Sequence, residues 1–247
     1  MAKDPIRPTD DTARTLAKEL LRGARFGALA VLDPDGGAPQ ASRTLVATDI
    51  DGTPVILAST LALHTRAILS DPRCSLLVGE PKKGDPLAWP RMSLACRAVR
   101  VEPETTTHSV VRRRFLSRHT KSSLYADFAD FSFFRLVPER GSLNGGFGRA
   151  YKIDLNDILI HSDLNEYLRS EEESVIDQLT SLVPDAPSVL AQHFFKIKSG
   201  GWKISGVDAE GLELSRGDQL HRLQVAKSVI NINALIASYS SLLMSIR

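Results

Sequence analysis

The short connections between successive apolar runs are the feature that most constrains how this chain can fold. Runs that predict β-strands cover residues 27–32, 40–48, 55–58, 74–79, 91–101 and 131–137. Turn segments rich in Asp, Gly and Pro separate the first three runs, at residues 33–37 and 49–54. Parallel neighbours need a crossover of a dozen or more residues, and several of these connections are far shorter. The sequence therefore predicts a mostly antiparallel β-barrel and excludes a doubly wound parallel sheet.

Helical patterns flank these strands and dominate the rest of the chain. Apolar residues spaced by three and four predict a helix over residues 10–23. Pro72 ends a predicted helix over residues 63–70. Acids followed by bases predict a helix over residues 104–119. The C-terminal pattern predicts a helix, three short strands and a final helix, at residues 163–183, 202–207, 212–215, 221–225 and 230–246. We therefore expect an α+β protein, with a barrel domain over residues 1–160 and a small α+β domain over residues 161–247.

Composition narrows the class of protein further. The 247 residues are 43% hydrophobic and 24% charged, as is usual for a folded chain with a large core. No apolar run approaches the roughly 18 residues that a membrane helix needs, and the polar N-terminus does not resemble a secretion signal. Cys74 and Cys96 lie in apolar runs without a metal-binding or redox spacing, which predicts buried thiols. We expect a cytoplasmic protein that binds neither a metal ion nor a membrane.

The charges are unevenly distributed along the chain. Residues 1–150 contain 22 Lys and Arg against 16 Asp and Glu, a balance of +6, whereas residues 151–247 contain 9 against 13, a balance of −4. An anionic ligand is therefore expected in the first part. This excess is too small for a nucleic-acid-binding surface. The basic run at 112–114 and the acidic run at 171–173 are both expected on solvated surfaces, with intersubunit salt bridges as the alternative for the arginines.

One segment carries the residue types that bind a phosphate group. Residues 58–66, Ala-Ser-Thr-Leu-Ala-Leu-His-Thr-Arg, place two hydroxyls at the end of a strand, and a threonine and an arginine in the first turn of a helix. Free N–H groups at a helix N-terminus, hydroxyl donors and a guanidinium all suit a phosphate monoester. Arg43, on the preceding strand, is expected to point into the same site. The alternative is that Ser59 or Thr60 caps the helix and Arg66 is a solvated surface residue.

Three segments in this order resemble the flavin-binding split barrels related to pyridoxamine 5′-phosphate oxidase. They are SRTLVAT from residue 42, LASTLALHTRAILSDPRCSLLV from residue 57 and RMSLACRAVRVE from residue 91. The segment SSLYADFADFSFFRLVPERGSLNGGFGRAYKI, from residue 122, is similar to the branch that includes the heme-utilisation proteins. The C-terminal segment WKISGVDAEGLELSRGDQLHRLQV resembles the small domain often fused to that branch. The resemblance covers nearly the whole chain from about Arg25 and implies an antiparallel split β-barrel.

The same resemblance implies an FMN site at the interface of a homodimer. The residues it implies for the cofactor are Arg43, Ser59, Thr65 and Arg66 at the phosphate, Thr60 near the flavin ring, and Arg91 as a weaker contributor. The implied function is that of an FMN-binding oxidoreductase acting on a small or planar aromatic substrate. Because the flavin would carry the redox chemistry, no catalytic side chain is assigned.

The chain departs from the family pattern in three places. The oxidases have a lysine directly after the arginine of the phosphate helix, where this chain has Ala67. The C-terminal segment with Arg and Trp that binds pyridoxal phosphate in the oxidases is not apparent. The histidine-rich stretch usual in the small domain is reduced to Asp185 and His193.

Two alternative functions stay open on the sequence. Heme binding or breakdown in iron acquisition requires an axial ligand and an apolar slot, and among the six histidines His161 is the best candidate. Phe147, which lies among glycines, is the candidate to cover a ligand. The other phenylalanines between residues 128 and 134 are expected in the core and the dimer interface. The second alternative is a non-enzymatic scaffold whose flavin pocket has lost its function.

Overall fold

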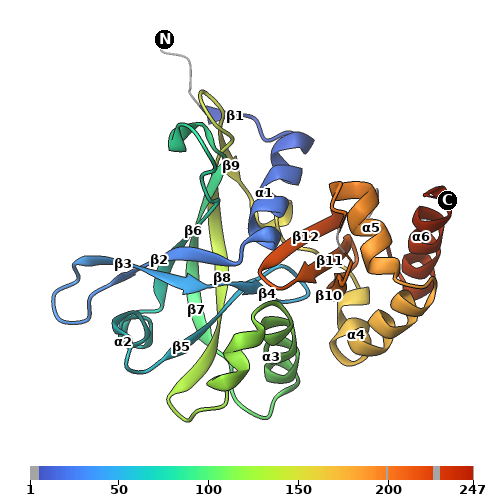
Figure 1. Ribbon diagram of the computed structural model, residues 1–247. Coiled ribbons are helices and arrows are strands. Elements are labelled where there is room, and N and C mark those ends of the chain that lie inside the picture. The colour runs from blue at the N-terminus through green and yellow to red at the C-terminus, as the bar shows by residue number, and fades with distance from the viewer. Residues whose placement is uncertain (1–5, 199, 225–228, 247) are drawn as a thin grey trace.

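The computed structural model describes residues 6–198, 200–224 and 229–246. Its N-terminal part is a nine-stranded sheet that curls into a barrel, and the C-terminal part lies beside that barrel (Figure 1). The barrel strands are β1 (Ile6–Arg7), β2 (Phe26–Leu32), β3 (Pro39–Leu45), β4 (Ala47–Thr48), β5 (Pro54–Ser59), β6 (Arg73–Val78), β7 (Arg91–Arg100), β8 (Phe131–Asn144) and β9 (Ala150–Ile153). The helices of this part are α1 (Asp11–Gly23), α2 (Leu63–Ser70) and α3 (Thr106–Arg118).

The large sheet is antiparallel in nearly every pairing, as the short connections predict. Its strands follow the order β1-β9-β8-β7-β6-β2-β3, and among the described strands β1 and β9 form the one parallel pair. The first half of β8 pairs with β5 and its second half with β9. This second pairing extends β8 to Asn144, beyond the strand end predicted at residue 137. The predicted α+β barrel class is confirmed.

The single strand predicted at residues 40–48 is two strands in the structure. β3 pairs with β2, where Arg43 lies opposite Ala28, whereas β4 pairs with β5. The chain changes partner at Val46, whose N–H donates to the carbonyl of Arg25 at 2.9 Å. Because side chains alternate along a strand, Ser42 and Arg43 point to opposite sides of β3.

Helices close the barrel where the sequence predicts them. α2 has the predicted bounds and packs into the barrel core through Ala67 and Ile68. α1 begins after Asp10, whose carboxylate accepts the N–H of Ala13 at 2.8 Å, as expected for an N-cap. Both cysteines are free and buried, as predicted. No helix in the described part of the chain combines the length and the apolar character that crossing a bilayer requires.

The C-terminal part is a three-stranded antiparallel sheet with helices packed on it. Its elements are α4 (Leu164–Ser181), α5 (Ala186–Phe195), β10 (Lys203–Asp208), β11 (Gly211–Arg216), β12 (Gln219–Gln224) and α6 (Ile232–Ser245). Helix α5 was not predicted, and Val225, the predicted end of the third strand, lies outside the described residues. The apolar core of this part includes Ile50 and Val110 from the barrel. The boundary at residue 160 therefore stays a prediction, because the two parts share packed side chains.

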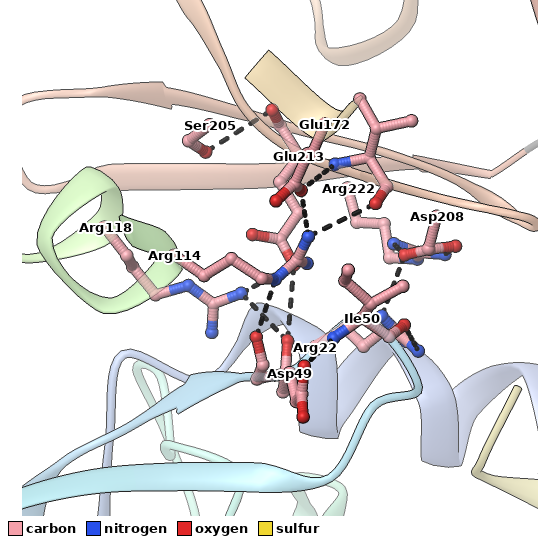
Figure 2. Close-up of polar contacts among 12 residues, drawn as sticks. Arg22, Asp49, Ile50, Arg114, Arg118, Glu172, Ser205, Asp208, Glu213 and Arg222 are labelled. Carbon is pink, nitrogen blue, oxygen red and sulfur yellow. Dashed lines mark hydrogen bonds and ion pairs between the residues drawn. The ribbon is translucent and has the colours of Figure 1, made fainter. Parts of the chain in front are cut away.

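Buried ion pairs connect the barrel to the C-terminal part (Figure 2). The members of this charge cluster, all buried, are Arg22, Arg114, Arg118, Glu172, Asp208, Glu213 and Arg222. Asp208 Oδ2 lies 2.8 Å from Nη1 of Arg22 on α1 and 2.7 Å from Nη1 of Arg222 on β12. Burial favours a raised pKa for Asp208, but the charges of these two arginines outweigh burial and hold the pKa well below its usual range.

Helix α3 supplies the other half of the cluster. Arg118 Nη2 lies 2.7 Å from Glu213 Oε1 on β11. Arg114 donates to the carboxylate of Glu172 on α4, and the same carboxylate accepts the N–H of Val207 at 3.0 Å. The cluster therefore contains no unpaired carboxylate, and each carboxylate of the C-terminal part contacts an arginine of the barrel part.

The solvated surfaces predicted for the two charged runs are wrong at Arg114 and Glu172. The two side chains are 3% and 1% exposed. Arg114 and Arg118 lie one turn apart on α3 and therefore share the face that meets the C-terminal part. Arg112 lies on another face, where it pairs with the exposed Asp127. Sequence periodicity on an isolated helix does not show that a second part of the chain covers its charged face.

The charge cluster generates a stability prediction. Asp208→Asn keeps the side-chain shape but removes the anion shared by Arg22 and Arg222, so two buried cations lose their counter-charge. We expect the free energy of unfolding to fall by about 3–5 kcal/mol in urea titrations. The control, Asp127→Asn, removes an exposed partner of Arg112 and should cost about 0–1 kcal/mol. Equal effects of the two substitutions would contradict the role assigned to the cluster.

His119 attaches the end of α3 to the barrel. Its ring is 4% exposed and packs, tilted by 50°, against Phe115 with 4.8 Å between centroids, and its Nε2 lies 2.9 Å from the carbonyl oxygen of Val46. Burial lowers the pKa of His119 to about 4, so the ring is neutral at pH 7 and Nε2–H is the donor.

A pH dependence follows from this neutral, buried ring. In the unfolded chain, His119 becomes protonated as the pH falls below about 6.5. In the folded protein, its ring stays neutral until the pH falls to about 4. The free energy of unfolding should therefore fall as the pH decreases through this window, by about 3 kcal/mol from this residue. In His119→Gln, the free energies of unfolding measured in urea at pH 7 and at pH 4.5 should differ less than in the wild type. The matched substitution of the exposed His161, to Gln, should leave the pH dependence of the wild type unchanged.

Candidate functional site

A shallow pocket of about 540 Å³ lies on the outer face of β2, β3 and β6. Phe26, Ala28 and Leu77 supply much of its apolar surface. Gly27 lies between the first two and faces the core, where an added Cβ would approach the carbonyl oxygen of Leu77 and Cδ1 of Leu76 to 2.8 Å. Glycine is therefore required for β2 to lie this close to β6.

Arg43 is the basic residue of this pocket. Its guanidinium carbon lies 5.3 Å from the centroid of the Phe26 ring, a distance at which the cation is attracted to the ring face. The side chain is exposed, so the guanidinium hydrogens can still reach an anionic ligand. Glu80 also lines the pocket, from the loop after β6. Apolar side chains beside one exposed arginine suit a largely apolar ligand that carries an acidic group.

The predicted phosphate residues at the end of β5 are engaged within the chain. Ser59 Oγ donates to Asp130 Oδ2 at 2.6 Å and accepts the N–H of Leu61 at 3.1 Å. Thr60 is exposed, and its N–H donates to the carbonyl of Asp130 at 2.8 Å. Neither residue caps α2, whose N-cap is Ala62 without a side-chain hydrogen bond, so the capping alternative is wrong.

The first turn of α2 places its two predicted residues in different environments. Thr65 is 1% exposed, and its hydroxyl has no hydrogen-bond partner among the described residues. Arg66 is exposed. Arg91, at the start of β7, donates Nη1–H to the carbonyls of Leu87 and Trp89, at 3.2 and 3.4 Å. Of the six predicted cofactor residues, Arg43 therefore lines the outer-face pocket, and the others do not.

One pair of residues that sequence reasoning missed adjoins this pocket. Ser42 Oγ lies 3.0 Å from His64 Nδ1, and Ser42 also lines the pocket. The His64 ring is half-buried, and burial lowers its pKa, so the neutral ring is favoured near pH 7. No described residue hydrogen-bonds to its Nε2. The alternation of β3 was the available signal, because Ser42 must face α2 if Arg43 faces outward.

The predicted heme ligand, His161, and the predicted ligand cover, Phe147, lie outside the outer-face pocket. His161 is exposed and borders another pocket, of about 700 Å³, with Asn165 and Arg169 at the start of α4. Phe147 is 68% exposed on the loop between β8 and β9 and does not line the outer-face pocket. Both assignments stay predictions. Of the predicted core phenylalanines, Phe133 and Phe134 are buried.

Comparison with known proteins supports the fold and the resemblance. Residues 14–145 match the pyridoxamine 5′-phosphate oxidase family. The non-canonical heme oxygenase HOZ, chloroplastic, of Arabidopsis thaliana is 35% identical over 136 residues, which are 54% of this chain and 40% of the relative. The chain thus spans less than half the length of that relative.

Two solved structures extend the similarity to the C-terminal part. A protein of unknown function from Agrobacterium tumefaciens has a TM-score of 0.81 at 29% identity, over 94% of this chain and 96% of its own. A heme binding protein from Mycobacterium smegmatis has a TM-score of 0.53 at 25% identity, over 98% of both chains. With the family match covering more than half of its length, the chain belongs to the pyridoxamine 5′-phosphate oxidase family.

Proposed function

We propose that the protein binds heme in the outer-face pocket and takes part in heme breakdown. The observation that carries the proposal is the apolar lining of Phe26, Ala28 and Leu77 with the exposed guanidinium of Arg43 beside it. The volume of about 540 Å³ lies within the range of small-molecule sites. Two relatives support the choice of ligand, because one is named a heme oxygenase and the other a heme binding protein.

The residues of the pocket fit the two chemical parts of a heme. A heme presents a planar apolar macrocycle and two carboxylates. The apolar floor suits the macrocycle, and Arg43 suits a carboxylate because its guanidinium forms paired, charge-assisted hydrogen bonds. When bound, the heme supplies an iron that reacts with oxygen. The part of this chain would be to hold the ring against β2 and to fix its orientation through Arg43.

No histidine is among the residues that line the outer-face pocket, so no ligand of the iron is assigned. His64, held by Ser42 through Nδ1, lies on the α2 side of β3, opposite the side to which Arg43 points. His161 borders a different pocket, near the start of α4.

FMN-dependent oxidoreductase activity is the second candidate function. It is supported by the family match and by Arg43 and Arg66, both exposed. The fit to an FMN phosphate is incomplete, because the Ser59 hydroxyl is engaged by Asp130 and the Thr65 hydroxyl is buried. A scaffold without cofactor remains the third hypothesis, and a cytoplasmic location remains a prediction from the sequence.

Self-association as a homodimer is part of the proposal. Leu45 on β3, Leu77 on β6 and Val99 on β7 are 38%, 41% and 46% exposed. Leu45 lies opposite Phe26, and Leu77 lies opposite Ala28 on the other edge of β2. A second copy of the chain would cover these apolar side chains and enclose the shallow pocket.

The cofactor proposal is tested by titrating the purified protein with hemin and, separately, with FMN. We expect a stable Soret band that survives dialysis. Arg43→Ala should weaken hemin binding about 10–100-fold, the value of one charge-assisted hydrogen bond. The control Arg97→Ala, at an exposed arginine of β7 paired with Glu139, should leave hemin affinity unchanged.

Three results would contradict the proposal in different ways. Hemin that is lost on dialysis excludes heme binding. Retained flavin absorption without a Soret band favours the FMN-dependent function. If both hemin and FMN are lost on dialysis, the result favours a scaffold without cofactor.

The dimer is tested by sedimentation velocity. Leu77→Asp places a charge on the proposed interface and should shift the protein to monomer at micromolar concentration. Met244→Asp, at a 76% exposed position on α6, is the matched control and should leave the dimer intact. A monomeric wild type, or a dimer that tolerates Leu77→Asp, would contradict this interface.

A further inference from the structure

The strongest feature outside the outer-face pocket is a carboxylate at the site where the family resemblance implies a phosphate. Asp130 lies directly before β8, whose first residue, Phe131, pairs with Ser59 at the end of β5. The carboxylate accepts the Ser59 hydroxyl at 2.6 Å. The carbonyl of the same aspartate accepts the N–H of Thr60 at 2.8 Å. Asp130 thus uses two of the donors that a phosphate would need.

Several other donors near this point are also unavailable, although the guanidinium of Arg66 is exposed. The N–H of Leu61 is donated to Ser59 Oγ at 3.1 Å. Thr65 is 1% exposed, so a ligand cannot reach its hydroxyl without rearrangement. Ala67 provides no cation in the position after Arg66. A serine hydroxyl has a single hydrogen to donate, so Ser59 cannot serve Asp130 and a phosphate together.

Charge adds to this competition for donors. A phosphate brought to Ser59 would approach the Asp130 carboxylate within a few ångströms, where two negative charges repel. No ion pair among the described residues neutralises Asp130, whereas the neighbouring Asp127 is paired with Arg112 at 2.6 Å. The carboxylate therefore repels a phosphate in addition to occupying its donor.

We propose that Asp130 is a specificity-determining residue, a built-in anion that keeps the phosphate of FMN out of the predicted cradle. The inference rests on the proposed function in one respect, because it explains how a member of this family would favour heme over FMN. The Asp130 side chain thus obstructs the predicted phosphate site at residues 59–66. Removing the carboxylate should free the Ser59 hydroxyl to donate a hydrogen bond to a phosphate.

The test compares FMN with riboflavin, which share the flavin ring and differ by the phosphate. Binding is measured by flavin fluorescence in the full-length protein. In the wild type we expect FMN and riboflavin to be bound equally weakly or not at all. In Asp130→Ala we expect FMN to bind about tenfold or more tighter than riboflavin, because a charge-assisted hydrogen bond becomes available. Adding Ser59→Ala to that variant should abolish the gain.

Two further variants separate this role from a structural one. Asp127→Asn is the matched control on the same segment and should bind both flavins as the wild type does. Asp130→Asn keeps the shape and the hydrogen-bond acceptor for Ser59, so it folds if the alanine variant does not. It should still favour FMN over riboflavin, because the repulsion is gone. If Asp130 had only a structural role, its substitution would change the affinities for FMN and for riboflavin by the same factor.

The inference is overturned if wild-type protein binds FMN more than tenfold tighter than riboflavin. It is also overturned if neither Asp130 variant distinguishes the two flavins. Hemin titration of the wild type is run separately. Failure of hemin to bind would remove the proposed function but not the result for Asp130, so the two failures can be told apart.

Discussion

The ion pairs that Asp208, Glu213 and Glu172 make with arginines of the barrel fix how the two parts of this protein are arranged. Each carboxylate comes from the C-terminal part, and each meets a cation from α1 or α3. Burying such charges is costly unless every one is paired. The barrel alone would expose three arginine side chains that pair with no other anion among the described residues, and the C-terminal part alone would expose the matching carboxylates. The C-terminal part is thus held against the barrel by these buried ion pairs (Figure 2).

Much of the fold could be predicted because its signals are local. The bounds of α2 follow from apolar spacing and from Pro72, and the cap of α1 follows from Asp10. Features that depend on distant partners could not be predicted. The length of β8 depends on β9, and the burial of Arg114 depends on residues almost sixty positions further along the chain. The sequence alone does not identify those partners.

The candidate site was less predictable than the fold for the same reason. Arg43 was identified by its charge and strand position, and it does line a pocket. Grouping it with Ser59 and Thr65 assumed that nearby segments share one site, whereas β3 turns Arg43 to its outer side. The role of Asp130 depends on the pairing of β5 with β8, across about seventy residues. A strand register of this kind follows from the whole barrel and from no single motif.

The branching of the sheet at β8 has a consequence for how the chain is synthesised. β5 pairs with β8, and β8 also holds β7 and β9, so the barrel has no closed form until Asn144 has emerged from the ribosome. Until then the nascent chain carries β5 with no partner beyond the two residues of β4. Unpaired strand edges of this kind invite association with other chains. The nascent chain is therefore most exposed to misassembly between the synthesis of β5 and that of β8, and a pause in synthesis would be most harmful in this interval.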